Sequence, residues 1–383
     1  MSDDASVRRR KVLLVDTLSS ANDFGVELPL ALNPLVELTV FTIRGTRLRA
    51  ADCHRLIVGF PEYWGARSKL AKLVDQLRSV RLLAHQLWLH RRGVVHVQFF
   101  RSMALELPLY LLMRPLLLRL VCTVHNVLPH EARPWHRAVY RLWYHQLDVL
   151  HVLSHHTAER LVREFGIPPG RILYAPHGNY TRFMRDHPPA DTSVTRQGLG
   201  LAADDRLVLY CGQIRPYKGV DRLIEAAALV QSPRVLIVAA GGCSAEAEQA
   251  MRQRMAALRL DPRRMQLQVG LLSNQAMSDL IAAADVMVFP YHHIYQSGAL
   301  LLAMTFGKAI IASQLPGFSE YLLPDVTGVL CDTADPVVLA SQIDRLAGDP
   351  QACAGLAVAA RKAADTTYAW PVIAGTLSAA YGD

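Results

Sequence analysis

Short apolar runs alternate with amphipathic stretches along nearly the whole chain of 383 residues, and this alternation limits the folds open to it. Such runs indicate strands buried on both faces, while the stretches between several of them have the apolar spacing of helices. Strand, helix and strand in this order predict a parallel sheet covered by helices, and so an α/β fold. The runs that we expect to be strands are 11–16, 36–42, 94–99, 120–125, 149–154, 172–175, 207–211, 235–239, 265–269, 286–289, 309–312 and 328–331.

Residues 186–205 interrupt the alternation. They contain Pro188, Pro189, a polar cluster and two glycines, which is typical of a linker or surface loop. The chain length suits two α/β domains of ordinary size. We therefore expect two doubly wound, Rossmann-like domains. Their predicted ranges are 1–185 and 206–365, joined by a linker at 186–205 and followed at 366–383 by a helix that packs back toward the first domain.

The charge of the chain is uneven. Up to residue 190 there are 26 Lys and Arg against 15 Asp and Glu, whereas the remainder has 15 against 18. A basic N-terminal half fits an anionic partner, such as a membrane surface, a nucleic acid or a phosphorylated ligand, but also a solvated surface without a partner. Within it, residues 68–93 are basic and have leucines at helical spacing. Such a helix can lie on an anionic membrane or pack its apolar face on the sheet.

The six cysteines are scattered, and no pair has C-x-x-C spacing. This pattern predicts free thiols in a reducing compartment. The apolar run after the first basic residues has only about five residues, too few for the core of a signal peptide. The most apolar stretch, 105–121, includes Glu106, Arg114 and Arg119, and we do not expect it to span a bilayer. The expected location is the cytoplasm, with contact at the inner face of the cytoplasmic membrane left open.

The clearest chemical signal follows the strand expected at 207–211. Arg215 and Lys218 stand at the carboxyl end of this strand, where open α/β sheets bind ligands. Gly212 and Gly219 allow close approach of a ligand to the backbone, and the helix that begins next adds a partial positive charge. Two cations and this dipole suit a diphosphate, although a basic surface loop is the alternative.

A second loop, after the strand expected at 286–289, carries Tyr291, Gln296, Ser297 and Gly298. A helix is expected to begin at Ser297 or Gly298. Ser297 can serve as its N-cap, with the first amides of the helix directed toward an anion. The capping role and an anion-binding role can coexist.

These two segments resemble the GT-B glycosyltransferases, in particular bacterial family-4-type enzymes that use nucleotide sugars to build exopolysaccharides and glycolipids. In that family the pattern G-x-[IL]-x-P-x-K-G contributes a basic pair to the donor diphosphate, and here it spans residues 212–219. Gln213 stands where the family usually has Arg, and we expect Arg215 to supply that charge. The two carboxylates of the family correspond to Ile294 and Leu302. Glu320 is the expected substitute near the nucleotide ribose.

The resemblance implies a metal-independent hexosyltransferase that needs no cofactor. Its donor would be a UDP- or GDP-sugar. Its acceptor would be a saccharide or a polyprenyl-diphosphate-linked sugar, and nucleic acid is not an expected partner. Because both family carboxylates are missing, two alternatives stay open. One is an epimerase or hydrolase of nucleotide sugars on the same frame, and the other is a sugar-binding relative without catalysis.

The first half is expected to bear the acceptor. His125 lies at the carboxyl end of the strand expected at 120–125 and is a candidate for proton transfer or for a hydrogen bond to a sugar hydroxyl. Glu131 and Asp23 are the other candidate bases. A base opposite the leaving group predicts inversion at the anomeric carbon, and its absence leaves retention open. The adjacent histidine pairs at 155–156 and 292–293 point in different directions and do not predict a metal site.

Overall fold

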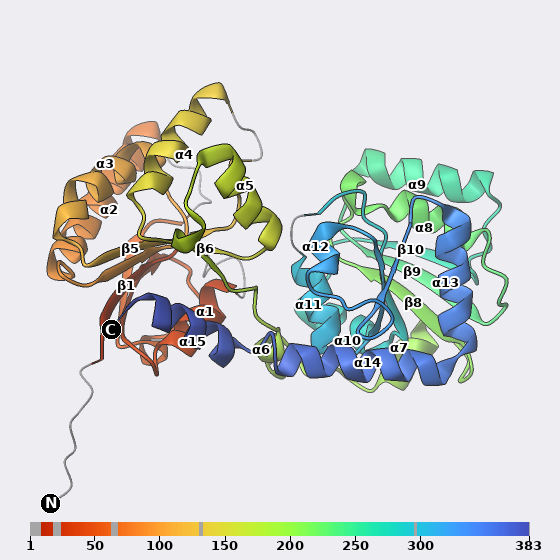
Figure 1. Cartoon of the computed structure of the whole chain (residues 1–383). Coiled ribbons are helices and arrows are strands. Elements are labelled where there is room, and N and C mark those ends of the chain that lie inside the picture. The colour runs from red at the N-terminus through yellow and green to blue at the C-terminus, as the bar shows by residue number, and fades with distance from the viewer. Residues whose placement is uncertain (1–8, 18–23, 63–67, 130–132, 295–296, 383) are drawn as a thin grey trace, which may run out of the picture. The chain divides into compact units, whose positions relative to one another are not determined.

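The structure, a computed structural model, describes residues 9–17, 24–62, 68–129, 133–294 and 297–382 (Figure 1). The chain divides into two compact units. The first consists of residues 1–178 and 370–383, and the second of residues 179–369. All six cysteines are free thiols, as expected.

The first unit contains, in its described part, a seven-stranded parallel sheet of order β3-β2-β1-β4-β5-β6-β7. Its strands are β1 (Lys11–Val15), β2 (Glu37–Ile43), β3 (Arg55–Phe60), β4 (Val94–Val97), β5 (Arg119–Val124), β6 (Val149–Val152) and β7 (Ile172–Tyr174). Its helices are α1 (Phe24–Leu32), α2 (Lys69–Leu89), α3 (Met103–Met113), α4 (Pro134–Gln146), α5 (His155–Phe165) and α15 (Trp370–Ala380), with 3-10 turns at Ala50–Asp52, Arg114–Leu116 and Pro169–Arg171.

Side chains of each central strand alternate between two apolar layers, as the two-residue period of a strand requires. Leu13 and Val15 lie in the layer that also contains residues of α2, α3, α4 and α5. Val12 and Leu14 lie in the other layer, with residues of α1 and α15. The sheet is therefore covered on both faces, which is why its strands are apolar throughout.

The second unit contains, among its described residues, a six-stranded parallel sheet of order β10-β9-β8-β11-β12-β13. Its strands are β8 (Arg206–Cys211), β9 (Val235–Gly241), β10 (Met265–Val269), β11 (Val286–Phe289), β12 (Ala309–Ser313) and β13 (Val329–Cys331). Its helices are α6 (Thr181–Asp186), α7 (Thr192–Gly198), α8 (Val220–Ala227), α9 (Ala245–Ala257), α10 (Asn274–Ala283), α11 (Gly298–Thr305), α12 (Pro316–Ser319), α13 (Pro336–Gly348) and α14 (Pro350–Asp365), with a 3-10 turn at Pro216–Lys218.

The strand order of the second unit reverses between β8 and β11. The chain runs from β8 outward to β10 on one side, returns to β11, and then runs outward to β13 on the other. Loops that leave the carboxyl ends of two such strands diverge and form a crevice, the usual ligand position in open α/β sheets. The sheet topology thus brings together the two loops that the sequence singled out.

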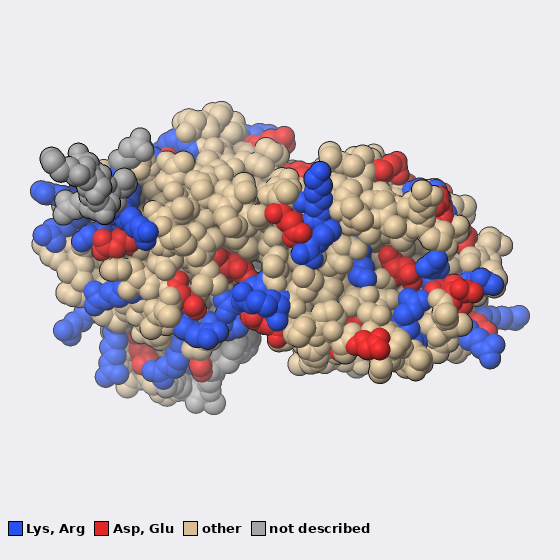
Figure 2. All heavy atoms as spheres, turned by 90° about the horizontal axis from the view of Figure 1, so that it is seen from below, with Lys and Arg blue, Asp and Glu red and all other residues tan. Residues whose placement is uncertain are grey.

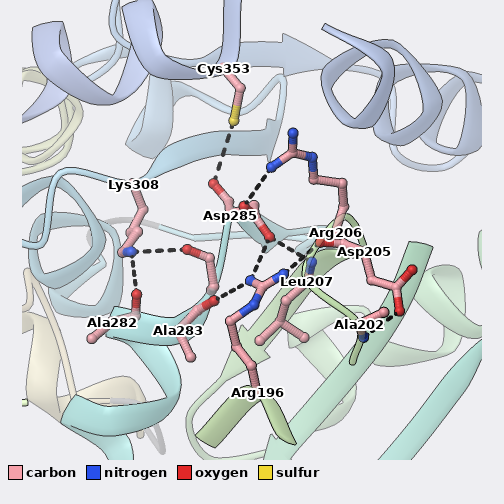
Figure 3. A network of polar contacts seen from close by, with 11 residues as sticks. Arg196, Ala202, Asp205, Arg206, Leu207, Ala282, Ala283, Asp285, Lys308 and Cys353 are labelled. Carbon is pink, nitrogen blue, oxygen red and sulfur yellow. Dashed lines mark hydrogen bonds and ion pairs between the residues drawn. The ribbon is translucent and has the colours of Figure 1, made fainter. Parts of the chain in front are cut away.

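The amino ends of the same two strands are held by a network of polar contacts (Figure 3). Asp285, just before β11, accepts hydrogen bonds from Arg196 at 3.0 Å and from Arg206 at 3.2 Å. Lys308 donates to the carbonyls of Ala282 and Ala284. Each charged group of this network has a partner, so it stabilises the sheet at the edge opposite the crevice.

The division between the units lies elsewhere than the sequence predicted. It falls between Gly178 and Asn179, whereas residues 186–205 carry α7, which packs on α10 within the second unit. Asp191 caps α7 by accepting from the amide of Ser193. A seven-residue helix flanked by proline and glycine has too little periodic sequence to be recognised as an element. The edge strand β3 is absent from the prediction, while the other twelve strands in the described segments lie at or near their expected positions.

Candidate functional site

The loops after β8 and β11 touch at a position that only glycine allows. Gly219 has φ +68°, and a Cβ there would lie 1.8 Å from the carbonyl oxygen of Pro290. The amide of His292 also donates to the carbonyl of Tyr217, at 2.8 Å. Any larger residue at 219 would push the two loops apart, because the clash is with backbone atoms.

Lys218 is placed above an aromatic ring by this arrangement. Its ammonium lies 5.5 Å from the centre of the Tyr291 ring, a cation–π contact. Its neighbours in the described part of the chain include the cation Arg215 and the neutral thiol of Cys211 but no carboxylate, and its pKa is lowered mainly by burial. A half-buried cation without an acidic partner is suited to an anionic ligand.

Gly212 lies next to this ammonium. Its φ of +137° lies outside the range that side chains favour, and a Cβ built on it would be 3.8 Å from Nζ of Lys218. The absence of a side chain keeps the space beside the lysine open. Arg215 is exposed, and its Nη2 donates to Oε1 of Gln213 at 3.2 Å. Gln213, which stands where the family usually has Arg, therefore contacts Arg215, the residue expected to supply the missing charge.

Ser297 caps α11, as predicted. Its Oγ accepts from the amide of Leu300 at 3.3 Å, and its side chain is buried. The hydroxyl of Ser297 also lies beside that of Tyr291. Burial raises the pKa of Tyr291, and the nearby Ser297 hydroxyl lowers it by a smaller amount. At Gly298 a Cβ would be 2.3 Å from Oη of Tyr180, so glycine makes room for this tyrosine. Before Leu300, the amides of Gly298 and Ala299 are at the positions that have no intrahelical partner.

The structure brings Gly212, Lys218, Tyr291, Ser297 and Gly298 to the carboxyl ends of the strands. Tyr291 differs from the others in its role. Its ring is buried against Phe289 and Phe318. Tyr291 therefore acts as a support for the ammonium of Lys218. A ligand could contact Tyr291 directly, as expected from the sequence, only by reaching its buried hydroxyl.

Glu320, the expected substitute near the ribose, lies close to Tyr368. It follows α12. Burial and, to a smaller extent, the Glu320 carboxylate raise the pKa of Tyr368 to about 12. Leu302, where the family usually has a carboxylate, is part of the apolar core. Three further predicted residues, Gln296, Glu131 and Asp23, lie outside the described residues.

In the first unit, His125 follows β5 and is half-buried. Its Nε2 lies 3.1 Å from Oε1 of Gln98, and its ring packs on Phe24 and Phe99. Burial, with smaller contributions from His151 and His177, lowers its pKa to about 3. Because a carbonyl oxygen can only accept, the neutral ring donates from Nε2 and keeps a lone pair on Nδ1. That nitrogen can accept a hydrogen bond from a hydroxyl.

Gln98 was not among the residues that the sequence suggested. It follows β4 in the segment Gln98-Phe-Phe100, and the adjacent position of β4 and β5 places it beside His125. A polar residue directly after an apolar strand was the available signal. In the described part of the chain, no group of three or more His, Cys, Asp or Glu is placed to hold a metal ion.

Comparison with known proteins supplies the family. A family model described as Glycosyltransferase Family 4 matches residues 30–181, and one described as Glycosyl transferases group 1 matches residues 191–363. The D-inositol 3-phosphate glycosyltransferase of Xylanimonas cellulosilytica is 29% identical over 61% of this chain and 56% of its own. The GDP-mannose:glycolipid 4-beta-D-mannosyltransferase of Xanthomonas campestris pv. campestris is 27% identical over 50% of this chain and 49% of its own.

The chain spans about half the length of the curated relatives it matches. Among solved structures, Anabaena HepE in complex with UDP superimposes with a TM-score of 0.75 at 17% identity, covering 97% of this chain and 99% of that one. This likeness confirms the predicted GT-B fold. The chain therefore belongs to the glycosyltransferases, with a family 4 domain at residues 30–181 and a group 1 domain at residues 191–363.

Proposed function

We propose that the protein transfers a sugar from a nucleoside-diphosphate sugar to a saccharide or lipid-linked acceptor in the synthesis of exopolysaccharide or another cell-surface glycan. The observation that carries the proposal is the ammonium of Lys218, held over Tyr291 at the strand-order reversal without a carboxylate partner among the described residues. The amino end of α11 lies at the same edge and favours negative charge.

The proposed reaction breaks the bond between the anomeric carbon and the β-phosphate oxygen. The acceptor oxygen forms the new bond to that carbon, and its proton passes to a base. Negative charge grows on the departing diphosphate, where Lys218, Arg215 and the first amides of α11 stabilise it. No step requires a metal ion.

His125 is the proposed partner of the acceptor hydroxyl. Its pKa of about 3 makes it a weak base at neutral pH, so a hydrogen bond from the hydroxyl to Nδ1 is its first role. Asp23 and Glu131 remain predicted bases. Two comparisons support a UDP- or GDP-sugar as donor: the Anabaena structure contains UDP, and the Xanthomonas relative is named for GDP-mannose.

Substitution of Lys218 tests the donor site. Lys218→Ala should lower turnover by about 2–3 kcal/mol of transition-state stabilisation, or roughly 30- to 150-fold, because one cation is lost beside the diphosphate. Nucleoside diphosphate release is measured with a panel of donors and acceptors. Arg234→Ala, which removes an exposed arginine before β9 at the opposite edge of the sheet, is the control and should be neutral.

The same assay separates the alternatives. Release that depends on an acceptor identifies a transferase, release without one identifies a hydrolase or epimerase, and silence identifies a binding protein. Wild-type turnover by the double variant Arg215→Ala/Lys218→Ala would contradict the donor-site assignment.

We further propose that the first unit contacts an anionic membrane through the N-terminal half of α2. Leu70, Leu73 and Leu77 are 71%, 47% and 52% exposed, so this apolar stripe is not packed on the sheet. Lys72, Arg78 and Arg81 are exposed on the same helix. Figure 2, which views the molecule from below, shows further Lys and Arg side chains scattered over the visible face of the first unit. Apolar residues flanked by cations are the pattern of helices that lie on membranes.

This contact would bring a lipid-linked acceptor to the enzyme without a membrane span. Throughout the described segments, no helix has both the length and the hydropathy needed to cross a bilayer.

A further inference from the structure

A pocket of about 370 Å³ opens in the first unit at the carboxyl ends of β4 and β5. The residues that follow these strands line one side of it, and α4 contributes much of the rest, including Trp135, Tyr140 and Trp143. The volume lies within the usual range of small-molecule sites, roughly 300–1,000 Å³. The pocket is therefore large enough for a ligand group.

The lining of this pocket is mostly aromatic and aliphatic. Phe99, Phe100 and Met103 lie on it together with the aromatic residues of α4. A bare sugar ring buried here would leave most of its hydroxyls without partners, which is unfavourable. The surface is suited to an apolar group.

Gln98 is, with Thr123, His125, Asn126 and His136, one of the few polar residues that line the pocket. Its side chain is 98% buried, and Oε1 accepts from Nε2 of His125. Its own amide nitrogen has no hydrogen-bond partner in the described part of the chain. Buried amide donors are nearly always paired in native proteins. Gln98 lines the pocket, so a turn of its side-chain amide would present this unpaired donor to an oxygen of a ligand.

We propose that this pocket binds the apolar group of the acceptor, a hydrocarbon chain or aryl ring joined to an oxygen that accepts a hydrogen bond from Nε2 of Gln98. The inference rests on the proposed transferase function and narrows its acceptor to a molecule with an apolar aglycone. Because the other atom of the same amide holds His125, the bound oxygen lies close to the proposed partner of the acceptor hydroxyl.

Simple alcohols test this site without knowledge of the sugar. The probes are 1-butanol, 1-hexanol and 2-phenylethanol, and binding to the full chain is followed by tryptophan fluorescence, because Trp135 and Trp143 line the pocket. Affinity should rise roughly fourfold for each methylene buried. Tighter binding of 1-hexanol than of 2-phenylethanol assigns a lipid chain, and the reverse order assigns an aryl group. Affinity that does not depend on apolar size would overturn the proposal.

Two substitutions locate the probe, each with a matched control. Gln98→Met should weaken binding about 2- to 12-fold by removing the donor, whereas Gln86→Met removes an equally buried glutamine outside the pocket and should not. Met103→Glu places a carboxylate in the pocket and should weaken binding of the alcohols. Leu105→Glu places a carboxylate in the same helix turn but outside the pocket, and should leave binding unchanged. Circular dichroism verifies folding. If Met103→Glu does not fold, the comparison of Gln98→Met with Gln86→Met still tests whether the probe binds in the pocket.

The outcomes also separate this inference from the proposed function. Acceptor-dependent release of nucleoside diphosphate without alcohol binding would remove the pocket assignment and leave the transferase. Alcohol binding that Gln98→Met weakens, in a protein that turns over no donor, would keep the apolar site and remove the transferase. Equal probe affinity of wild type and Gln98→Met would show that the unpaired amide is satisfied by something other than a ligand, such as a buried water.

Discussion

Two buried histidines in the first unit are joined by hydrogen bonds whose protons can all be assigned. Nε2 of His151 lies 2.9 Å from the carbonyl oxygen of Ala175, which can only accept, so Nδ1 of His151 accepts from the hydroxyl of Thr123. That hydroxyl accepts in turn from Nε2 of His96, and Nδ1 of His96 accepts from Tyr381. With both imidazoles neutral, each bond of this chain has one donor and one acceptor.

Acid should therefore destabilise the first unit. Burial lowers the pKa of His151 to about 4, and that of His96 is lowered well below its usual value, mainly by burial. Between the unfolded pKa near 6.5 and pH 4 the unfolded chain binds more protons, so stability falls as pH falls through this window. His151 alone contributes roughly 3 kcal/mol of this loss.

Urea unfolding at several pH values between 4 and 7.5 measures the effect. The variant His151→Gln should show a flatter pH dependence than wild type, while the exposed His85→Gln should match wild type. Parallel curves for wild type and His151→Gln would contradict the assignment of the acid sensitivity to this network.

At the scale of elements, the sequence predicts what depends on local pattern. Buried parallel strands are continuous apolar runs, and the loops at 212–219 and 291–298 follow directly from their strands. β3 escapes prediction because it is an edge strand with Val58 half exposed. Contacts between distant residues also escape it. Tyr381 and His96 are 285 positions apart, and the pocket requires α4 to lie over the ends of β4 and β5.

Helix α2 shows what hydrophobic periodicity cannot predict. The helical spacing of its leucines was compatible with packing either on a membrane or on the sheet. The structure divides the helix: Leu83 and Leu87 are buried, whereas the leucines of its first half are exposed. Leu73→Asp/Leu77→Asp should abolish flotation with vesicles that contain phosphatidylglycerol, because it puts charge on the stripe that enters the lipid.

Leu271→Asp replaces an exposed leucine of the second unit and serves as the control, with flotation unchanged. Absence of wild-type flotation at low salt, or equal flotation of the double variant, would contradict the membrane contact. Added salt should weaken wild-type binding, since part of the attraction is electrostatic.

At the scale of the whole molecule, two separate apolar cores are completed by a chain that passes between the units twice. One passage is at residues 178–179 and the other at 369–370. The last helix, α15, packs on α1, and its Trp370, Ile373 and Leu377 belong to the same core layer as Val12 and Leu14. A Cβ at Gly178 would lie 2.3 Å from Trp370, so the end of the first passage fits closely against the end of the second. The first unit therefore depends on a helix that follows the whole second unit in the sequence.

Leu377→Ala tests this dependence. The side chain is fully buried, and its truncation should lower the free energy of unfolding of the first unit by about 2–5 kcal/mol through lost burial and a cavity. Hydrogen exchange followed by mass spectrometry should show faster exchange in β1 and β4, while β8 and β11 keep their protection because their core contains no residue of α15. Val372→Ala, at an exposed position of the same helix, should leave both units unchanged. An equal loss of protection in both sheets would mean that the two cores unfold as one, and that the last helix stabilises more than the unit on which it packs.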